Sequence, residues 1–520
     1  MKNICEILSL SSVRYPFKTA IIFGQQKISY SDLDIFTDRL AQGLKELGVS
    51  KEDRVALLLS NSPHFVICYF AIIKLGAIVV PINHMFKAEE ISYIISDSRA
   101  SVLITSGAYL DTAIDIRKEI ECFKHILSTR KAKEEIISIY EWIYDSQKEF
   151  DQRTEVSQDD IAAILYTSGT TGYPKGAMLS HGNLISNVLA SKEAIGVTNK
   201  DKAICILPLF HSFAASVCML LPLYAGGTVV IMRSARPFKR TIRAIIKNRV
   251  TVFVGIPSLY NILKDVKLPK ILNSFIIRFI LPIRVCISGA AALPIPTWER
   301  FQKRFRVPLL EGYGLTEASP VVSLNPYKGI NKAGSIGLPL NGVEVIIVNE
   351  KGNPVEAGQV GEIIVKGPNV MKGYFDKPDA TQETIKNSWL YTGDLGKKDQ
   401  DNYIYIVGRK KDMVNVRGLN VYPREIEDLL YQHPKVKEAA VIGVADYHKG
   451  EVPKGFIVLE DGVSATEREF ILYLREHLAN YKIPRHIEFR QNLPKNTTGK
   501  ILKRVLIEEE HSRSGNNLNN

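Results

Sequence analysis

The sequence predicts a large α/β domain of parallel-rich sheets at the N-terminus, a small β-rich subdomain after it, and a small α+β domain at the C-terminus. Through roughly the first 400 residues, short apolar runs bounded by glycine or proline alternate with helical patterns. Such alternation is typical of mostly parallel sheets covered by helices. The length of 520 residues exceeds what one hydrophobic core usually serves, so two or more domains are expected.

Several segments carry the α/β prediction. The helical pattern from residue 63 to residue 75 is followed by Gly76, which is suited to cap a helix. Apolar runs short enough to be buried strands occur at residues 77–81, 161–165, 229–231, 252–257 and 285–288.

The strand at 161–165 leads into the most informative motif, Tyr166-Thr-Ser-Gly-Thr-Thr-Gly-Tyr-Pro-Lys-Gly176. Its glycines allow backbone N–H groups to approach an anion closely, its hydroxyls are donors, and Lys175 is a cation. The spacing differs from the Walker pattern. The motif nevertheless contains what a polyphosphate requires, which a plain polar turn does not need.

Two further strands are predicted to end in glycine-containing turns, at residues 288–291 and 311–317. Ligands collect at the carboxyl ends of strands in open α/β sheets, so both turns are candidate parts of a binding site. From about residue 335 the pattern changes to hairpins, with strands predicted at 343–348 and 360–366.

A compact α+β unit is predicted after residues 408–412, beginning with a helix at 423–430 that has proline in its first turn. We place the domain boundary near Lys411. The predicted organisation is therefore a domain at 1–410, a second domain at 411–510, and a polar tail at 511–520 that we expect to be disordered.

Composition is that of a soluble globular enzyme, with 45% hydrophobic and 23% charged residues. The six cysteines are scattered without metal-ligand spacing, which favours buried thiols in a reducing compartment, and no secretory signal or membrane-spanning segment is visible. We therefore expect a cytoplasmic protein. The net charge of +12 suits anionic ligands or an anionic membrane surface; because it is spread along the chain, we expect no nucleic-acid partner.

Five segments in order give the chain a resemblance to the adenylate-forming (AMP-binding) superfamily, which includes acyl-CoA synthetases, peptide-synthetase adenylation domains and firefly luciferase. The resemblance covers nearly the whole chain and is strongest to medium- or long-chain fatty acyl-CoA synthetases. The segments are residues 166–176, 311–317, 391–395, 408–421 and 494–500.

The resemblance implies that a carboxylate attacks the α-phosphorus of ATP, that pyrophosphate leaves, and that the thiol of CoA cleaves the acyl-adenylate. Lys500 matches the lysine that bridges the substrate carboxylate and the α-phosphate. Thr316 matches the threonine that contacts the α-phosphate, and Glu317 matches the acid that holds Mg²⁺. From the residues alone, Glu317 could also be a solvated surface acid and Lys500 a solvated loop lysine.

The nucleotide positions follow from the same resemblance. Tyr313 could instead be an ordinary core aromatic, and Arg409 a salt-bridge partner of a nearby acid. Asp394 matches the acid that accepts hydrogen bonds from both ribose hydroxyls. The full set of positions expected to bind ATP or AMP is Thr167, Ser168, Gly169, Thr170, Thr171, Gly172, Lys175, Gly289, Ala290, Glu311, Gly312, Tyr313, Asp394 and Arg409.

The resemblance also assigns the acyl and CoA ends of the site. Lys411 matches a hinge about which a mobile C-terminal domain rotates between half-reactions, bringing Arg417 and Gly418 toward CoA. Arg417 could equally face solvent. The predicted entrance of the acyl pocket is formed by His211, Phe213, Ala214 and Ala215. His211 could be structural rather than catalytic.

The leading hypothesis is a fatty acid–CoA ligase with ATP and CoA as co-substrates. Within the same chemistry, an acyl-AMP ligase that loads an acyl-carrier protein and an aryl-acid CoA ligase remain alternatives. A luciferase-like oxygenase and an inactive acyl-binding protein represent different classes. Neither acyl length nor oligomeric state follows from the sequence.

Overall fold

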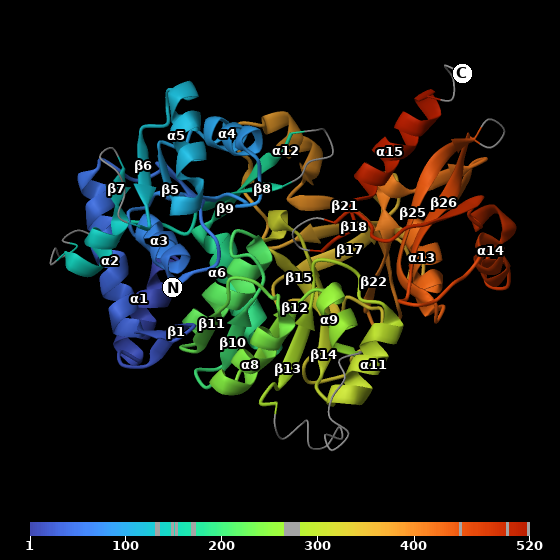
Figure 1. Ribbon diagram of the computed structural model, residues 1–520, viewed down its shortest axis with the longest axis horizontal. Helices are drawn as coiled ribbons and strands as arrows, with labels where there is room; N and C mark the ends of the chain where they lie inside the picture. Colours follow the sequence, from blue (N-terminus) through green and yellow to red (C-terminus); the bar gives the residue numbers. More distant parts are fainter. Residues whose placement is uncertain are drawn as a thin grey trace.

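The computed structural model describes residues 1–130, 136–146, 150, 154–167, 173–264, 281–446, 450–495 and 499–516. Two large sheets and a β-rich subdomain form the N-terminal part, and a smaller unit packs beside them at the C-terminal end (Figure 1). The prediction of an α/β domain, a β-rich subdomain and a small α+β domain is confirmed.

The first large sheet is parallel at its centre and antiparallel at both edges. Within the described residues its strands are, in spatial order, β16 (Leu338–Pro339), β15 (Val321–Leu324), β14 (Leu309–Gly314), β13 (Val285–Ser288), β12 (Val252–Gly255), β10 (Lys202–Cys205), β11 (Thr228–Ile231), β1 (Thr19–Phe23) and β2 (Gln26–Ser29).

The second large sheet is also mainly parallel, apart from its β19–β9–β8 edge. Its described strands are β19 (Gly373–Tyr374), β9 (Lys175–Ser180), β8 (Ile161–Thr167), β4 (Ile78–Pro81), β3 (Arg54–Leu58), β5 (Val102–Thr105), β6 (His125–Ser128) and β7 (Ile137–Ser138).

Helices cover these sheets, and their ends follow the local sequence. Ser29 and Ser180 each cap a helix in a reciprocal capping box, and Gly76, with φ of +70°, follows the end of α3 as expected. The helices are α1 (Cys5–Arg14), α2 (Tyr30–Glu46), α3 (Pro63–Lys74), α4 (Ala88–Asp97), α5 (Leu110–Glu119), α6 (His181–Ile195), α7 (Leu221–Tyr224), α8 (Phe238–Asn248), α9 (Pro257–Lys264), α11 (Ile295–Phe305) and α12 (Pro378–Thr384).

The predicted turn at residues 311–317 is wrong in its first half, because β14 continues to Gly314 and pairs with β15. The glycines there serve close strand packing rather than a turn. A Cβ on Gly314 would lie 2.2 Å from the carbonyl oxygen of Pro320. The chain turns only afterwards, in the short helix η4 (Thr316–Ala318).

The β-rich subdomain contains an antiparallel sheet of β17 (Glu344–Val348), β18 (Gly361–Lys366), β21 (Trp389–Lys398), β20 (Ile385–Lys386) and β22 (Ile404–Arg409). The C-terminal sheet consists of β24 (Leu419–Val421), β23 (Val414–Val416), β26 (Gly450–Leu459), β25 (Val436–Asp446) and β27 (His486–Phe489). Its helices are α13 (Pro423–Gln432), α14 (Glu467–Arg475) and α15 (Lys503–Asn516).

The predicted disordered tail needs a correction. Helix α15 extends through residue 516, so it includes the first part of the segment 511–520. The Arg513 guanidinium donates to Glu488 of β27 at 2.9 Å, which ties the helix to the sheet by an ion pair that the polar composition did not reveal. Residues 517–520 lie outside the described part of the chain.

Separate hydrophobic clusters support the predicted division of the chain. Buried residues up to Ile404 belong to the clusters of the large domain, and the clusters after it begin at Val414. Lys411 lies between them in the short helix η5 (Lys410–Asp412). The boundary at 410/411 and the hinge role of Lys411 remain predictions.

Candidate active site

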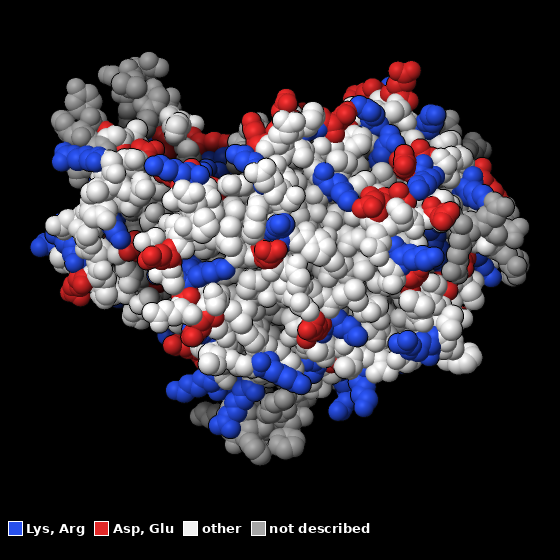
Figure 2. Space-filling view, turned by 180° about the vertical axis from the view of Figure 1, so that it is seen from behind, with Lys and Arg blue, Asp and Glu red and all other residues white. Residues whose placement is uncertain are grey.

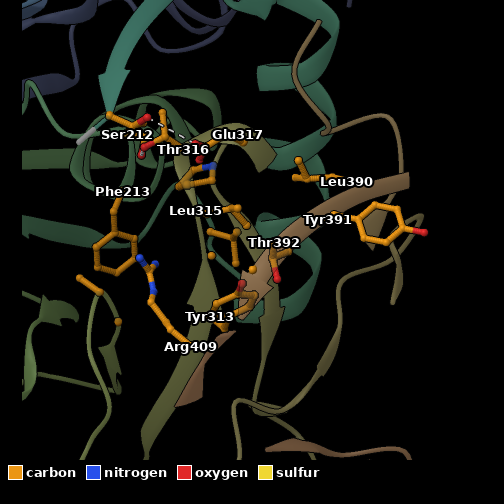
Figure 3. A pocket seen from close by; sticks show the side chains of 18 of the residues that line it. Ser212, Phe213, Tyr313, Leu315, Thr316, Glu317, Leu390, Tyr391, Thr392 and Arg409 are labelled. Atoms are coloured by element: carbon orange, nitrogen blue, oxygen red, sulfur yellow. Dashed lines mark hydrogen bonds between the residues drawn. The ribbon is translucent and has the colours of Figure 1, made fainter. Parts of the chain in front are cut away.

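A cavity of about 780 Å³ brings together residues from both large sheets, the β-rich subdomain and the C-terminal domain. Figure 3 shows side chains from widely separated segments around it, with Ser212, Thr316 and Glu317 close together and Tyr313 near Arg409. The cavity lining includes Thr167, Lys175, His211, Phe213, Ala214, Gly289, Ala290, Gly312, Tyr313, Thr316, Glu317, Arg409 and Lys500.

The phosphate end of the cavity is a hairpin. Strands β8 and β9 pair so that Thr167 faces Lys175, and the loop between them carries the predicted polyphosphate motif. Its central residues Ser168, Gly169, Thr170, Thr171 and Gly172 lie outside the described residues. The ammonium of Lys175 lies 5.5 Å from the centroid of the Tyr374 ring.

Helix α4 holds both arms of this hairpin. The Tyr166 hydroxyl donates to Asp97 at 2.7 Å, while the Tyr93 hydroxyl donates to the carbonyl of Pro174 at 3.0 Å. The Tyr93 ring also stacks on Tyr173, with centroids 5.0 Å apart. The start and the end of the loop are thus fixed to one helix, a contribution that the sequence pattern did not indicate.

Glu317 is held at the same end by two hydroxyls. Its Oε1 accepts from Tyr374 at 2.9 Å and from Thr167 at 3.4 Å. The Thr316 hydroxyl lies 3.3 Å from that of Ser212. Among the described residues, no group of three or more His, Cys, Asp and Glu side chains could hold a metal. Glu317 suits Mg²⁺ only as a single carboxylate completed by phosphate oxygens and water.

The predicted ribose acid has two protein partners in this structure. Asp394 accepts a hydrogen bond from the Tyr313 hydroxyl at 2.6 Å and pairs with Arg409 at 2.9 Å. Burial and the Asp394 carboxylate raise the pKa of Tyr313 well above its usual value, so the phenol keeps its proton. The two interpretations of Arg409, a nucleotide contact and a salt-bridge partner, do not exclude each other. The side chain pairs with Asp394 and also lines the cavity.

Small residues follow strand β13 at the opposite wall. A Cβ on Gly289 would come within 2.9 Å of the Phe213 ring, so glycine permits this ring to close the cavity. Ala290 has φ of +69°, a left-handed conformation that is uncommon outside glycine and often marks functional sites.

Glu311 is buried, at 3% exposure, and like Asp394 it lines an adjoining cavity of about 290 Å³ rather than the main one. Its Oε1 accepts from the backbone N–H of Leu293 at 2.9 Å. Burial raises the pKa of Glu311 to about 7, and the nearby Arg424 of α13 acts in the opposite direction.

Lys500 reaches both cavities from the C-terminal domain. Burial, with a smaller contribution from Arg409, lowers its pKa to about 8. The preceding Gly499 has φ of +75°, and a Cβ there would lie 2.8 Å from Ile256 and 3.0 Å from Ser258. Glycine thus allows the loop carrying Lys500 to approach the large domain closely.

Of the four residues predicted for the acyl entrance, His211, Phe213 and Ala214 line the cavity and Ala215 does not; their role in binding an acyl chain remains a prediction. Burial lowers the pKa of His211 to about 4, so the ring is neutral near pH 7. Ala215 is buried but is not part of the cavity wall, whereas Ala214 and Val217 are. Residues 214–220 form a π-helix, so their side chains point in other directions than they would in an α-helix. π-Helical turns occur often at functional sites.

The inner apolar wall was missed at the level of sequence because its members come from separate elements. They share only their position on the cavity, and no local pattern connects α6, η3 and β15. They are Ile195, Val217, Val321 and Leu324.

The predicted CoA residues are not brought to the site. Arg417 and Gly418 form the exposed two-residue turn of the β23–β24 hairpin, with φ of +52° and +85°. Positive φ at both positions suits a type I′ turn. Within the described part of the chain, a Cβ on Gly418 would meet no atom within 4 Å.

Comparison with known proteins identifies the family of the chain. The AMP-binding enzyme family matches residues 9–375, and the AMP-binding enzyme C-terminal domain matches residues 425–500. The chain therefore belongs to the AMP-binding, adenylate-forming enzymes.

Individual relatives cover nearly the whole chain. A long-chain-fatty-acid–CoA ligase of Bacillus subtilis is 37% identical over 98% of this chain and 95% of its own length, and a feruloyl-CoA synthase of Amycolatopsis is 35% identical over 94% and 95%. The crystal structure of an anthranilate CoA ligase with anthranoyl-AMP superimposes with a TM-score of 0.91 at 30% identity, covering 99% of this chain and 98% of the other. ATP-bound MatB of Rhodopseudomonas palustris gives 0.90 at 32%, covering 98% and 99%.

Proposed function

We propose that this protein is an AMP-forming acid–CoA ligase whose acid is a medium- or long-chain fatty acid. The observation that carries the proposal is the composition of one cavity, which is lined by cations and hydroxyls and also by the apolar side chains of Ile195, Val217 and Leu324. A carboxylate on an alkyl chain and a nucleotide triphosphate have this distribution of polarity.

The first step requires two anions to meet. The substrate carboxylate needs no base, so the contribution of the protein is to position it against the α-phosphate and to neutralise developing charge. Lys500 and Arg409 supply cations at that point of the cavity, and Lys175 supplies one beside the departing phosphates. Thr316, which lines the same cavity, would donate a hydrogen bond to the α-phosphate.

Glu317 would hold the Mg²⁺ ion that accompanies ATP, and the ion would supply positive charge to offset that of the phosphates. The protein keeps this carboxylate in place through the hydroxyls of Thr167 and Tyr374. His211, neutral and part of the cavity wall, would orient the carboxylate by a hydrogen bond rather than by charge.

The second step would use CoA as the acyl acceptor, after rotation of the C-terminal domain about Lys411. Withdrawal of Lys500 and presentation of the Arg417–Gly418 turn would exchange one set of groups for the other. An aryl acid is the alternative substrate, favoured by the 35% identity to a feruloyl-CoA synthase.

A panel of carboxylic acids tests both the proposed reaction class and the proposed substrate. We expect ATP-dependent pyrophosphate release with C8–C18 fatty acids, AMP as the second product, and acyl-CoA when CoA is added. Formation of ADP would contradict the reaction class. Preference for cinnamates over all alkyl acids would contradict only the substrate.

Val217→Phe should shift the preference toward shorter acids, because each methylene excluded from the apolar wall costs about 0.8 kcal/mol. Ala215→Val is the matched control: it enlarges a neighbouring side chain that does not line the cavity, and its chain-length profile should stay near that of the wild type. An unchanged profile in Val217→Phe would place the acyl chain elsewhere.

A further inference from the structure

We propose that helix α8 and the segment before it form a docking surface for an anionic lipid bilayer. The surface is defined by six side chains, here called the basic face: Arg233, Arg236, Lys239, Arg240, Arg243 and Lys247. This deepens the proposed function, because a fatty acid partitions into membranes, but its test is independent of catalysis.

The basic face is a concentration of unneutralised charge. All six side chains are exposed, and residues 233–248 contain no Asp or Glu. None of the six forms an ion pair with a described residue, although many other cations of this chain do. The expectation that the positive charge is spread evenly along the chain is therefore wrong at this segment.

Three of these cations lie on one face of helix α8. Lys239, Arg243 and Lys247 follow each other at intervals of four residues and so share one face of α8. The opposite face carries the buried Thr241 and Ile245, which fix the helix against the protein. Like charges four residues apart repel and weaken a helix, so this arrangement opposes folding unless an anionic partner offsets it.

A second helix of the large domain also carries exposed cations. Arg300 and Lys303 lie on α11 and Arg306 follows its last residue, against the single exposed carboxylate Glu299. Figure 2 shows several Lys and Arg side chains along the lower edge of the molecule.

A bilayer fits this surface better than a small anion or a nucleic acid. The charges extend over several helical turns without enclosing a pocket, and none of the six lines the active-site cavity, so no single phosphate is enclosed. The apolar Ile246 is 43% exposed among them, a feature that suits the interfacial region of a membrane. No described helix is long and apolar enough to cross a membrane.

The experiment is vesicle flotation of the full-length protein without ATP or CoA. We expect binding to phosphatidylglycerol–phosphatidylcholine vesicles at low salt, weak binding to pure phosphatidylcholine, and loss of binding as salt rises. The triple variant Lys239→Glu/Arg243→Glu/Lys247→Glu should bind the anionic vesicles about tenfold less or weaker still. Unchanged binding of this variant, or no binding of the wild type, overturns the proposal.

A matched control has the same change in net charge at exposed, unpaired cations elsewhere: Lys45→Glu/Arg468→Glu/Arg475→Glu on α2 and α14. Its vesicle binding should stay within about twofold of the wild type. Equal losses in both triples would mean that only net charge matters, and tighter binding to a single-stranded RNA than to the vesicles would assign the face to nucleic acid. Either outcome overturns the proposal.

Activity separates this proposal from the proposed function. With a short, water-soluble fatty acid, the α8 triple variant should retain wild-type pyrophosphate release, because no substituted residue lines the cavity. With a long-chain acid delivered in anionic vesicles, its rate should fall in parallel with binding. If the wild-type protein is active on no acid, the proposed function is overturned, while the flotation result still stands.

Discussion

Two loops of the C-terminal domain differ in their surroundings. The loop ending in Lys500 lies against the large domain, and its lysine lines the cavity with Thr316 and Arg409. The turn at Arg417–Gly418 is exposed, and no atom of the described residues lies within 4 Å of a Cβ placed on Gly418. The structure thus assembles the groups suited to adenylate formation and leaves those expected to meet CoA outside.

The contrast between the two loops limits how the C-terminal domain can serve both half-reactions. Both loops belong to the unit whose core begins at Val414, so moving one toward the cavity moves the other. If the same cavity serves both half-reactions, the domain must turn, and the segment Lys410–Asp412 between the cores is the place for it. Substitutions in the two loops should therefore affect different half-reactions.

Lys500→Ala should reduce adenylate formation by a factor of about 10³, since it removes a preorganised charge at the transition state. Thioester formation from supplied acyl-adenylate should change little, because Lys500 would then lie away from the site. Pyrophosphate release and acyl-CoA output measure the two steps. Equal losses in both would mean that Lys500 serves folding or both arrangements.

Gly418→Leu should show the reverse pattern: pyrophosphate release continues, bound acyl-adenylate accumulates, and acyl-CoA output falls by about two orders of magnitude through obstruction of the CoA thiol arm. Gly462→Leu is a matched control, because Gly462 has φ of +78° and open space around its Cβ position in the same domain. If both variants behave alike, the loss reflects backbone strain and not the CoA path.

Gly499→Ala should impair only the first step, by about tenfold or more, because its Cβ would contact Ile256 and Ser258 and its φ of +75° disfavours side chains. The thermal unfolding midpoint should change little, since the contact exists only in the adenylate-forming arrangement. A loss of thioester formation from supplied acyl-adenylate would contradict that account.

The pH dependence should reflect the lowered pKa of Lys500, about 8 in the free protein. The lysine is charged below that pH and neutral above it, so kcat/KM of adenylation for ATP should decline about tenfold per pH unit above 8. Lys500→Arg, to the extent that it is active, should lack this decline because a guanidinium does not titrate there. A decline that persists in Lys500→Arg would assign the titration to another group.

The sequence alone predicted the α/β character of the large domain, the hairpin subdomain and a set of polar site candidates, because glycine-bounded apolar runs and donor-rich loops are local signals. Thr167, Lys175, Thr316, Glu317, Tyr313, Asp394 and Arg409 were all predicted in this way or by resemblance, and the structure gathers them. The loop residues 168–172 lie outside the described part.

Which side chains face each other could not be predicted from the sequence and became clear only from the tertiary structure. The extension of β14 through Gly314 depends on pairing with β15, the exclusion of Ala215 depends on the π-helix at 214–220, and the fixing of the phosphate hairpin depends on Tyr93 of α4. The physical reason is common to all three: the deciding contacts join segments distant in the chain, and their energies exceed local preferences that a sequence pattern can report.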